Sequence, residues 1–561
     1  MLNLLPRRLL PLLLGAIAAP ALAVGIDLRA PDAIGALLTP YLPEEAGSQR
    51  KLQGLVSEIL STEGYFSPQF EFSETADDLV LKLDPGPRTT IAEVAVSIDG
   101  DLAAATRESL IAGWHLPVGE PFRQDDWNTA KQQVLAELLA VEHPAAKLVD
   151  SRAEIDSETH TAQLSARYNA GPRYRFGELR IEGLQRYDPA LIERYNRSVR
   201  AGDPYREDRL SALQSNLQGT PYFSSVEAGL DMDAEVGPDG TVSVPVVLHL
   251  REQPAHSIAF GAGVSSNTGA RVEFSYHTPD VFNRAWQMDS GLRLEQKKQT
   301  VYSDFFLPPD ERQRRHSFGI MAEGTDIQGL RTERYAFGVQ TVQQRGSVEQ
   351  RLSLNWEDEK RQADGIPTST ARALVPNAMW TLRQVDSVLD PRHGFVLQVQ
   401  AGGGAKAALS DQNFIRLHAR YQHFFPLGRV DTLALRGEFG YTLADSRQGI
   451  PQDYLFRSGG TGSIRGYSYQ SLGVQAGSAI VGGRYMGVLS AEATHLLDES
   501  WGIAGFVDAG DAVDDLKYRS PAIGYGLGAR WRSPAGPIGA DLAYGQRTGH
   551  IQLHFSLAIP F

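Results

Sequence analysis

The 561-residue sequence contains no cysteine, which excludes disulfide bonds, thiolate metal ligands and thiol nucleophiles. Basic residues are also in the minority, because 54 Lys and Arg stand against 67 Asp and Glu and leave a net charge of -13 at pH 7. This acidic balance argues against nucleic acid as a partner, since phosphate binding requires clustered Lys and Arg. After residue 23 no segment reaches roughly 18 continuous apolar residues, so no membrane-spanning helix is expected there.

The first 23 residues have the three parts of a secretory signal peptide. Arg7 and Arg8 form a basic region, residues 9–19 an apolar core, and Ala21-Leu22-Ala23 a cleavage site of small residues. The apolar core is too short to cross a bilayer, which takes roughly 20 helical residues. We therefore expect residues 1–23 to direct export and then to be cleaved.

Residues 24–254 contain an internal repeat. The motif Pro-Gly-Pro-Arg at 85–88 recurs as Ala-Gly-Pro-Arg at 170–173, and the motif at 119–123 recurs at 202–206 after nearly the same interval. Self-similarity at a fixed period indicates repeated structural units.

Two hydrophobic periods alternate within a repeat. Leu179 and Ile181 alternate with charged residues, as in a half-buried strand. Other apolar residues recur at helical spacing on one face, namely Trp127, Ala130, Val134, Leu135, Leu138 and Leu139. Each unit therefore combines a strand, helices and a strand pair. We expect three such α+β modules, at 24–86, 87–171 and 172–254.

From about residue 255 the sequence changes to short alternating segments rich in glycine and aromatic residues. Alternation of apolar and charged residues over about ten positions is typical of a transmembrane barrel strand. Sixteen segments have this character, an even number as bacterial single-chain barrels require. They lie near 257–264, 269–277, 288–296, 299–306, 315–324, 332–341, 347–357, 374–383, 394–402, 412–422, 431–441, 483–494, 503–508, 521–531, 537–545 and 550–561. We expect residues 255–561 to form an all-β, 16-stranded antiparallel transmembrane β-barrel.

The connections between these segments differ in length. If the first strand starts at the periplasmic side, the short connections at 423–430 and 532–536 lie in the periplasm. The long connections at 358–373 and 442–482 then lie on the outer side. A loop as long as 442–482 is uncommon without a function.

The most informative residues lie in that last loop and in a later strand. The loop carries Gly459-Gly460-Thr461-Gly462-Ser463-Ile464-Arg465-Gly466-Tyr467, and the strand carries Phe506-x-Asp508-x-Gly510. An arginine can hold a carboxylate by two parallel charge-assisted hydrogen bonds, so Arg465 and Asp508 could fix the loop inside a cavity. The alternative is that Arg465 lies in solvent at the tip of the loop.

These motifs, together with a last strand ending in Phe561, resemble the outer-membrane assembly factor superfamily, whose BamA-like members insert or export proteins through a β-barrel. The resemblance covers most of the chain after the signal sequence. In the family the loop folds into the barrel lumen, where its arginine contacts the strand acid. The resemblance therefore implies a loop lock made by Ile464, Arg465, Gly466, Tyr467, Phe506, Asp508 and Gly510.

The N-terminal units resemble POTRA domains, the periplasmic modules that the superfamily uses to capture other proteins. Three modules before a sixteen-stranded barrel look like the TamA family, the outer-membrane subunits of the translocation and assembly module. This resemblance implies assembly or translocation of autotransporters and other β-barrel proteins. It implies as partners unfolded substrates, the lipid bilayer and a TamB-like, inner-membrane-anchored protein that spans the periplasm. The implied location is the bacterial outer membrane, with the modules in the periplasm.

The first and last strands must meet for a barrel to close. Gly261 and Gly263 lie in the first strand, and glycine weakens a strand through lost entropy and missing side-chain contacts. A weak seam is a candidate lateral gate, because its backbone groups could pair with a substrate strand. Alternatively, these glycines only accommodate the curvature of the barrel. The predicted seam comprises Gly261, Gly263, Leu553, Phe555, Leu557 and Phe561.

Two other classes of function are less compatible with the sequence. An enzyme needs a nucleophile with a base in reach, but no Gly-x-Ser-x-Gly motif occurs and the histidines lack metal-binding spacing. We expect no enzymatic activity, no cofactor and no metal. A passive channel does not need periplasmic modules. An exporter of the two-partner secretion type remains the alternative function.

Overall fold

The computed structural model describes residues 25–43, 48–75, 78–234, 236–238, 240–517, 520–533 and 536–557. The predicted signal peptide and Phe561 lie outside the described residues. The chain forms two compact units, one comprising Met1–Arg180, Ser198–Ala212 and Ala228–Leu248 and the other Ile181–Arg197, Leu213–Glu227 and His249–Phe561. Within the described ranges, no helix has both the length and the apolar character needed to cross a membrane.

The N-terminal part consists of three modules with the same order of elements. The first contains β1 (Gly25–Arg29), α1 (Asp32–Leu38), α2 (Gln49–Thr62), β2 (Gln69–Glu74) and β3 (Asp78–Asp84). The second contains β4 (Thr90–Asp99), α3 (Ala104–Ala112), α4 (Gln124–Ala140), β5 (Lys147–Asp156) and β6 (Thr161–Asn169). The third contains β7 (Arg173–Glu182), α5 (Ala190–Tyr195), α6 (Glu207–Gln218), β8 (Phe223–Leu230) and β9 (Thr241–Glu252).

In every module the last strand lies in the middle of a three-stranded sheet, in the orders β1-β3-β2, β4-β6-β5 and β7-β9-β8. The first strand of each of the first two modules pairs with that central strand in parallel, whereas the other pairing is antiparallel. Two strands of each sheet are therefore edges. The predicted repeat of α+β modules is confirmed.

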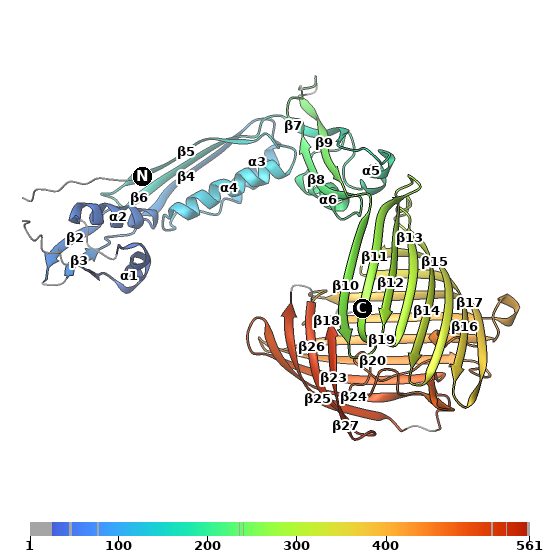
Figure 1. The fold of residues 1–561 in the computed structure, drawn as a ribbon. Coiled ribbons are helices and arrows are strands. Elements are labelled where there is room, and N and C mark those ends of the chain that lie inside the picture. The colour runs from blue at the N-terminus through green and yellow to red at the C-terminus, as the bar shows by residue number, and fades with distance from the viewer. Residues whose placement is uncertain are drawn as a thin grey trace, which may run out of the picture. The chain divides into compact units, whose positions relative to one another are not determined.

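The core of the second module shows why these residues form these elements. Trp127, Ala130, Val134 and Leu138 recur on one face of α4 and are buried. Alternate residues of β6 are buried on the facing side of the sheet. Figure 1 shows α4 lying along this sheet. The helical and strand periods of the sequence therefore meet in one hydrophobic core.

The C-terminal part is one sheet of sixteen strands (Figure 1), in which each strand is hydrogen-bonded antiparallel to the sheet strand that follows it in sequence. The strands are β10 (Ser257–Ser265), β11 (Gly269–Val281), β12 (Trp286–Glu295), β13 (Lys298–Phe306), β14 (Arg315–Ile327), β15 (Leu330–Arg345), β16 (Val348–Ala363), β17 (Ile366–Val385), β18 (Gly394–Gly404), β19 (Phe414–Leu427), β20 (Asp431–Leu443), β23 (Tyr485–Leu496), β24 (Trp501–Val513), β25 (Ala522–Ser533), β26 (Gly536–Gly545) and β27 (His550–Leu557). Every predicted segment corresponds to one of these strands, and the predicted fold class is confirmed.

The two faces of this sheet differ in chemistry. Leu352 and Leu354 are among the large apolar side chains that point outward and remain exposed. On the inner face, Glu357 and Glu359 are buried among arginines, and Arg361 pairs with Glu359 at 2.5 Å. Apolar-out and charged-in alternation suits a barrel in lipid, because hydrocarbon solvates apolar side chains and excludes charges.

The prediction of a long outer connection at 358–373 is wrong. β16 continues to Ala363 and β17 begins at Ile366, so only two residues separate these strands. The charged residues that suggested a loop are inward-facing strand residues such as Glu359, whose carboxylate is neutralised inside the barrel. The predicted connection at 442–482 is a long one, running from the end of β20 to the start of β23.

The two ends of the large sheet are not joined by a ladder. The strand order runs from β10 to β27, and no pairing between these two strands is found among the described residues. Among the described residues, one hydrogen bond joins β27 to the turn after β10 across the gap, in which the Phe555 backbone N–H donates to the Ser266 side-chain hydroxyl at 3.3 Å. The barrel is thus nearly closed, and the closing pair of strands expected from the sequence is absent from the described residues.

Candidate functional site

The connection between β20 and β23 lies inside the barrel. It contains a 3-10 turn (Gln452–Tyr454) and a small hairpin of β21 (Val474–Ala476) and β22 (Ala479–Val481). Ile450, Ile464 and Tyr467 in this segment are almost completely buried. Most loops run over the surface, because a buried loop must find partners for its polar backbone groups. This loop finds them on the inner wall, where the Gln452 N–H donates to the Glu359 carboxylate.

Arg465 and Asp508 are brought together at the centre of this lumenal loop. The guanidinium donates from Nε to Asp508 Oδ2 at 2.8 Å and from Nη2 to Oδ1 at 3.0 Å. The backbone N–H of Arg465 donates to the same carboxylate at 3.0 Å. Arg465 is 6% exposed and Asp508 is 0% exposed. A two-pronged contact between buried opposite charges fixes both position and orientation, which a single contact would not do.

Two further acids complete the surroundings of the guanidinium. Arg465 Nη1 donates to Glu492 at 2.6 Å and to Asp541 at 3.2 Å. Arg530 bridges the same two acids, with contacts of 2.8 Å to Glu492 and 2.6 Å to Asp541. The Arg465–Asp508 pair is therefore one part of a five-residue network of two cations and three anions.

Sequence reasoning missed Glu492, Asp541 and Arg530. Each is an inward-facing charge in an alternating strand, and such charges occur on many strands of this barrel. Their positions in register with the lock strand, through the ladders β23–β24–β25–β26, are what bring them to the same point. The only signal in the sequence was a charged residue within each alternating segment.

The other predicted lock residues surround Arg465. The Phe506 ring lies flat against the guanidinium, with its centroid 3.4 Å from Cζ, a cation–π arrangement. Ile464 packs in an apolar cluster with Tyr467. The Tyr467 hydroxyl donates to the Ile523 carbonyl at 3.0 Å and accepts from the Arg547 N–H at 2.9 Å. All these contacts tie the loop to β24 and β25 or to the turn after β26.

Glycine allows the loop and the wall to approach at backbone distance. Gly466 has φ +86°. A Cβ placed on Gly466 would lie 2.7 Å from the backbone of Tyr544 and Gly545, and one on Gly524 would lie 1.8 Å from the Arg465 carbonyl oxygen. Gly510 is constrained in the same way, since its Cβ would lie 2.2 Å from the Gly487 carbonyl oxygen.

This packing predicts that Gly466→Ala displaces the loop. The methyl group would force both a left-handed backbone conformation on alanine and a clash with β26, at a cost of about 1–3 kcal/mol. Gly462→Ala is the matched control in the same loop, because no atom lies within 4 Å of its Cβ position. Urea titration of the folded barrel, followed by its gel mobility, should show a lower midpoint for Gly466→Ala only. Equal midpoints would contradict the tight fit.

The predicted seam residues lie on the two strands that end the sheet. Gly261 and Gly263 pair with Glu273 and Arg271 of β11 on one side. Leu553 and Phe555 point outward from β27 and are 51% and 54% exposed. Leu557 is the last residue of β27, and Phe561 lies outside the described residues.

Next to the barrel, the third module contributes an aromatic cluster. The Tyr222 hydroxyl donates to the Ala285 carbonyl, in the turn between β11 and β12, at 2.9 Å. The Tyr222 ring packs edge-on against Tyr187 and Phe223. Burial raises the pKa of Tyr222 far above its usual range and that of Tyr187 to about 12, so both phenols keep their protons. The Tyr222 hydroxyl is therefore a permanent donor to this turn.

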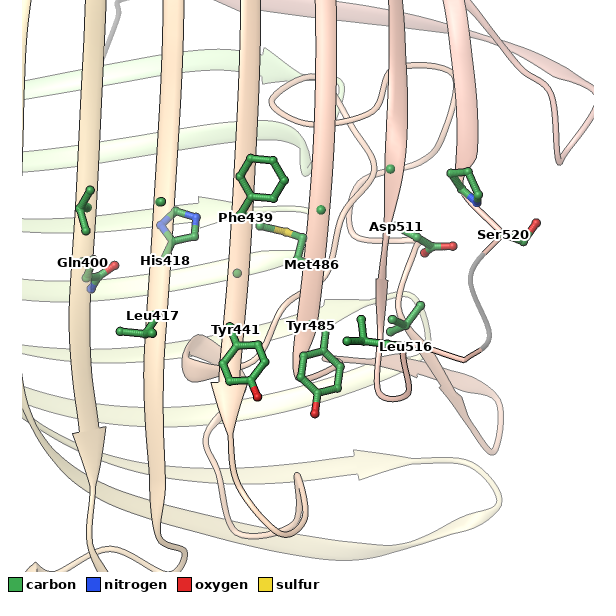
Figure 2. Close-up of a pocket in the computed structure, with 17 residues that line it drawn as sticks. Gln400, Leu417, His418, Phe439, Tyr441, Tyr485, Met486, Asp511, Leu516 and Ser520 are labelled. Atoms are coloured by element: carbon green, nitrogen blue, oxygen red, sulfur yellow. The ribbon is translucent and has the colours of Figure 1, made fainter.

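An apolar groove of about 720 Å³ lies on the outer face of the wall that holds the loop. Figure 2 shows Leu417, Phe439, Tyr441 and Tyr485 along it, with Leu516 at one end. Leu417, Phe439 and Tyr441 are exposed on the outward side of their strands. The groove thus belongs to the apolar exterior and does not open the lumen.

Comparison with known proteins identifies the barrel. A model of the Omp85 superfamily domain matches residues 254–561. The chain is 23% identical over 459 residues to the outer membrane protein assembly factor BamA of Neisseria meningitidis serogroup B, covering 69% of this chain and 56% of that protein. It is 22% identical over 516 residues to the BamA of Nitratidesulfovibrio vulgaris, covering 85% of this chain and 62% of that protein. The chain thus spans less than two thirds of the length of these relatives.

A solved structure shares the fold. The crystal structure of BamA from Haemophilus ducreyi lacking POTRA domains 1–3 matches with a TM-score of 0.70 at 18% identity, covering 83% of this chain and 99% of that one. The structural likeness agrees with the family match, which extends over more than half of the chain. The chain therefore belongs to the Omp85 superfamily.

Proposed function

We propose that this protein is an outer-membrane insertase of the TamA type, which assembles or translocates autotransporters and other β-barrel proteins. The observation that carries the proposal is a barrel whose first and last strands share no ladder among the described residues, while a buried loop stabilises the wall formed by β23 to β26. Such a barrel can offer a strand edge to a substrate without losing its own structure. The family and the fold place the barrel in the outer membrane and the N-terminal modules in the periplasm.

The lateral seam is the proposed site of substrate entry. Gly261, Gly263, Leu553, Phe555, Leu557 and Phe561 are its residues. Around this seam the barrel exterior is apolar, and hydrocarbon cannot satisfy free backbone N–H and C=O groups. An incoming substrate strand is therefore driven to pair with the open edges of β10 and β27. Each added hairpin then presents a new open edge, whose backbone groups need the next substrate strand as their partner.

The loop lock has the complementary role. Ile464, Arg465, Gly466 and Tyr467 are held by Phe506, Asp508 and Gly510, so β23 to β26 stay in register while the seam opens. A buried charge network has a narrow set of favourable geometries, which makes the wall stiff. The loop also lies inside the lumen, which argues against a passive channel.

The three modules are proposed to be POTRA domains with boundaries at 24–86, 87–171 and 172–254. Each has two edge strands, and an extended peptide can add to such an edge through main-chain hydrogen bonds. The proposed partners are unfolded outer-membrane proteins and a TamB-like protein that reaches from the inner membrane. The relatives named as outer membrane protein assembly factors support outer-membrane proteins as the substrates.

Reconstitution tests the proposal. The full-length protein in lipid vesicles should speed the insertion of an unfolded autotransporter barrel by at least about tenfold over empty vesicles, equivalent to about 1.4 kcal/mol of activation free energy. Acquisition of protease resistance by the substrate measures insertion. A second assay measures ion conductance of the same vesicles.

Two outcomes would contradict the proposal. Conductance without any acceleration of insertion would indicate a channel. Secretion of one dedicated soluble partner into the vesicle lumen, with no effect on barrel substrates, would indicate an exporter of the two-partner type.

A further inference from the structure

The lumenal loop touches both sides of the open seam, and this contact is separate from the Arg465 lock. Thr461 lies four residues before Arg465 in the same loop. Its hydroxyl is 3.2 Å from the Ser266 hydroxyl and 3.5 Å from Asn267 Oδ1, both in the turn between β10 and β11. The same hydroxyl is 3.4 Å from His554 Nδ1, on the inner face of β27. One side chain of the loop therefore reaches the first hairpin and the last strand.

The direction of these hydrogen bonds follows from His554. The Gly466 N–H donates to His554 Nε2 at 3.0 Å, so Nε2 must be unprotonated. In the neutral ring the proton then resides on Nδ1, which can only donate to the Thr461 hydroxyl. The Thr461 hydroxyl, having accepted from His554, is free to donate to Asn267 or Ser266. The result is a directed chain from β27 through the loop to the β10–β11 turn.

The end of this chain at His554 and Gly466 is buried, whereas Ser266 at the other end is exposed. His554 is 3% exposed, and Gly466 packs against the backbone of Tyr544 and Gly545. A second contact ties the loop to β27, because the Gln552 amide donates to the Ser468 hydroxyl at 3.2 Å. The direct contact across the seam, from the Phe555 N–H to Ser266, adjoins the same group. The buried Gly466–His554 hydrogen bond is shielded from water and therefore contributes more than the exposed contacts where no ladder exists.

We propose that the lumenal loop is a clasp across the seam, in which Thr461 and His554 are positioning residues that hold the first hairpin to the last strand. The inference rests on the proposed function only in taking this seam as the site of substrate entry. The loop is anchored to β24 through Arg465 and Asp508, and Gly466, the next residue, is bonded to His554. If Arg465 separates from Asp508, the loop can move away from His554 and the seam loses this contact. If a substrate displaces Thr461 alone, the seam loosens while Arg465 remains bound to Asp508.

Hydrogen exchange in the full-length protein tests the clasp. Thr461→Val keeps the size of the side chain and removes its hydroxyl, whereas Thr461→Ser keeps the hydroxyl. We expect backbone amides of β10 and β27 to exchange about three- to tenfold faster in Thr461→Val, as expected for one lost hydrogen bond. Amides of β24 should be unchanged, because Arg465 still holds Asp508.

Thr548→Val is the matched control. Thr548 lies in the turn between β26 and β27, and its hydroxyl donates to the carbonyl of Gly545, the last residue of β26, at 3.2 Å. This variant and Thr461→Ser should exchange like the original protein. His554→Leu, which removes both hydrogen bonds of the imidazole, to Gly466 and to Thr461, should accelerate β10 and β27 at least as much as Thr461→Val. Unchanged exchange at both strands in Thr461→Val and His554→Leu would overturn the clasp, as would equal loosening of all strands.

The insertion assay on the same variants separates the clasp from the proposed function. Faster seam exchange together with a changed insertion rate supports both. Faster seam exchange with an unchanged insertion rate supports the clasp and contradicts the seam as the entry site. An altered insertion rate with unchanged seam exchange overturns the clasp and leaves the insertase function standing.

Discussion

Arg465→Ala should lower the free energy of unfolding of the barrel by about 3–5 kcal/mol, the range for removing one partner of a buried ion pair. The change leaves Asp508 fully buried with the Ser490 hydroxyl as its remaining side-chain donor. It also leaves Glu492 and Asp541 to share Arg530 alone. The same loss should abolish insertase activity, because the wall is no longer held in register. Urea titration in lipid vesicles measures the stability.

Two variants make this test specific. Arg331 of β15 forms an exposed ion pair with Asp326 of β14, so Arg331→Ala should lower the free energy of unfolding by less than about 1 kcal/mol. Arg465→Lys keeps the charge but loses the planar fork that bonds both oxygens of Asp508, so it should recover only part of the stability. If Arg465→Ala and Arg331→Ala had the same free energy of unfolding, the proposed role of Arg465 as a loop lock would be refuted.

Exchanging the two charges distinguishes the five-residue network from an isolated ion pair. Arg465→Asp combined with Asp508→Arg restores the pair in isolation, but the new aspartate would face Glu492 and Asp541. We therefore expect the double variant to stay unstable. Full recovery in the double variant would show that Asp508 alone sets the position of Arg465, against the five-residue network.

A covalent link across the seam should abolish insertion entirely. The chain has no cysteine, so Ser266→Cys with Phe555→Cys introduces the only two thiols. The hydrogen bond between these residues places their backbones close together, and a short bifunctional maleimide can join the thiols where disulfide geometry is not met. Linked protein should lose all insertion activity, and reduction of the disulfide form should restore it, because substrate strands need a free edge.

The control is a link between strands that already share a ladder. Ala322 and Tyr335 are partners in the β14–β15 register, so the double cysteine variant at these positions joins strands that need not separate. Its activity should be unchanged by cross-linking. Full activity of a barrel that is demonstrably linked at Ser266 and Phe555 would exclude the lateral seam.

Much of the fold was predictable because barrel strands carry a local signal. Alternation of apolar and polar residues depends only on which face of one strand meets lipid, so all sixteen strands were recognisable one at a time. The failure at 358–373 has the same origin. Glu359 and Arg361 look like loop residues when read alone, and only their contact inside the lumen makes them strand residues.

The candidate site likewise has features that the sequence predicted and features that only the structure revealed. The sequence by itself determined the strand number and the module repeat, because each depends on a local pattern. The pairing of Arg465 with Asp508 was implied by the family motif, and the structure confirms that the two side chains meet. Only the tertiary structure decided that Glu492 and Asp541 share the same guanidinium, that β10 and β27 lack a common ladder among the described residues, and that Thr461 and His554 meet at that gap. The physical reason is that inward-facing polar residues look alike in every strand. The register of the sheet and the path of one buried loop determine which of them come into contact.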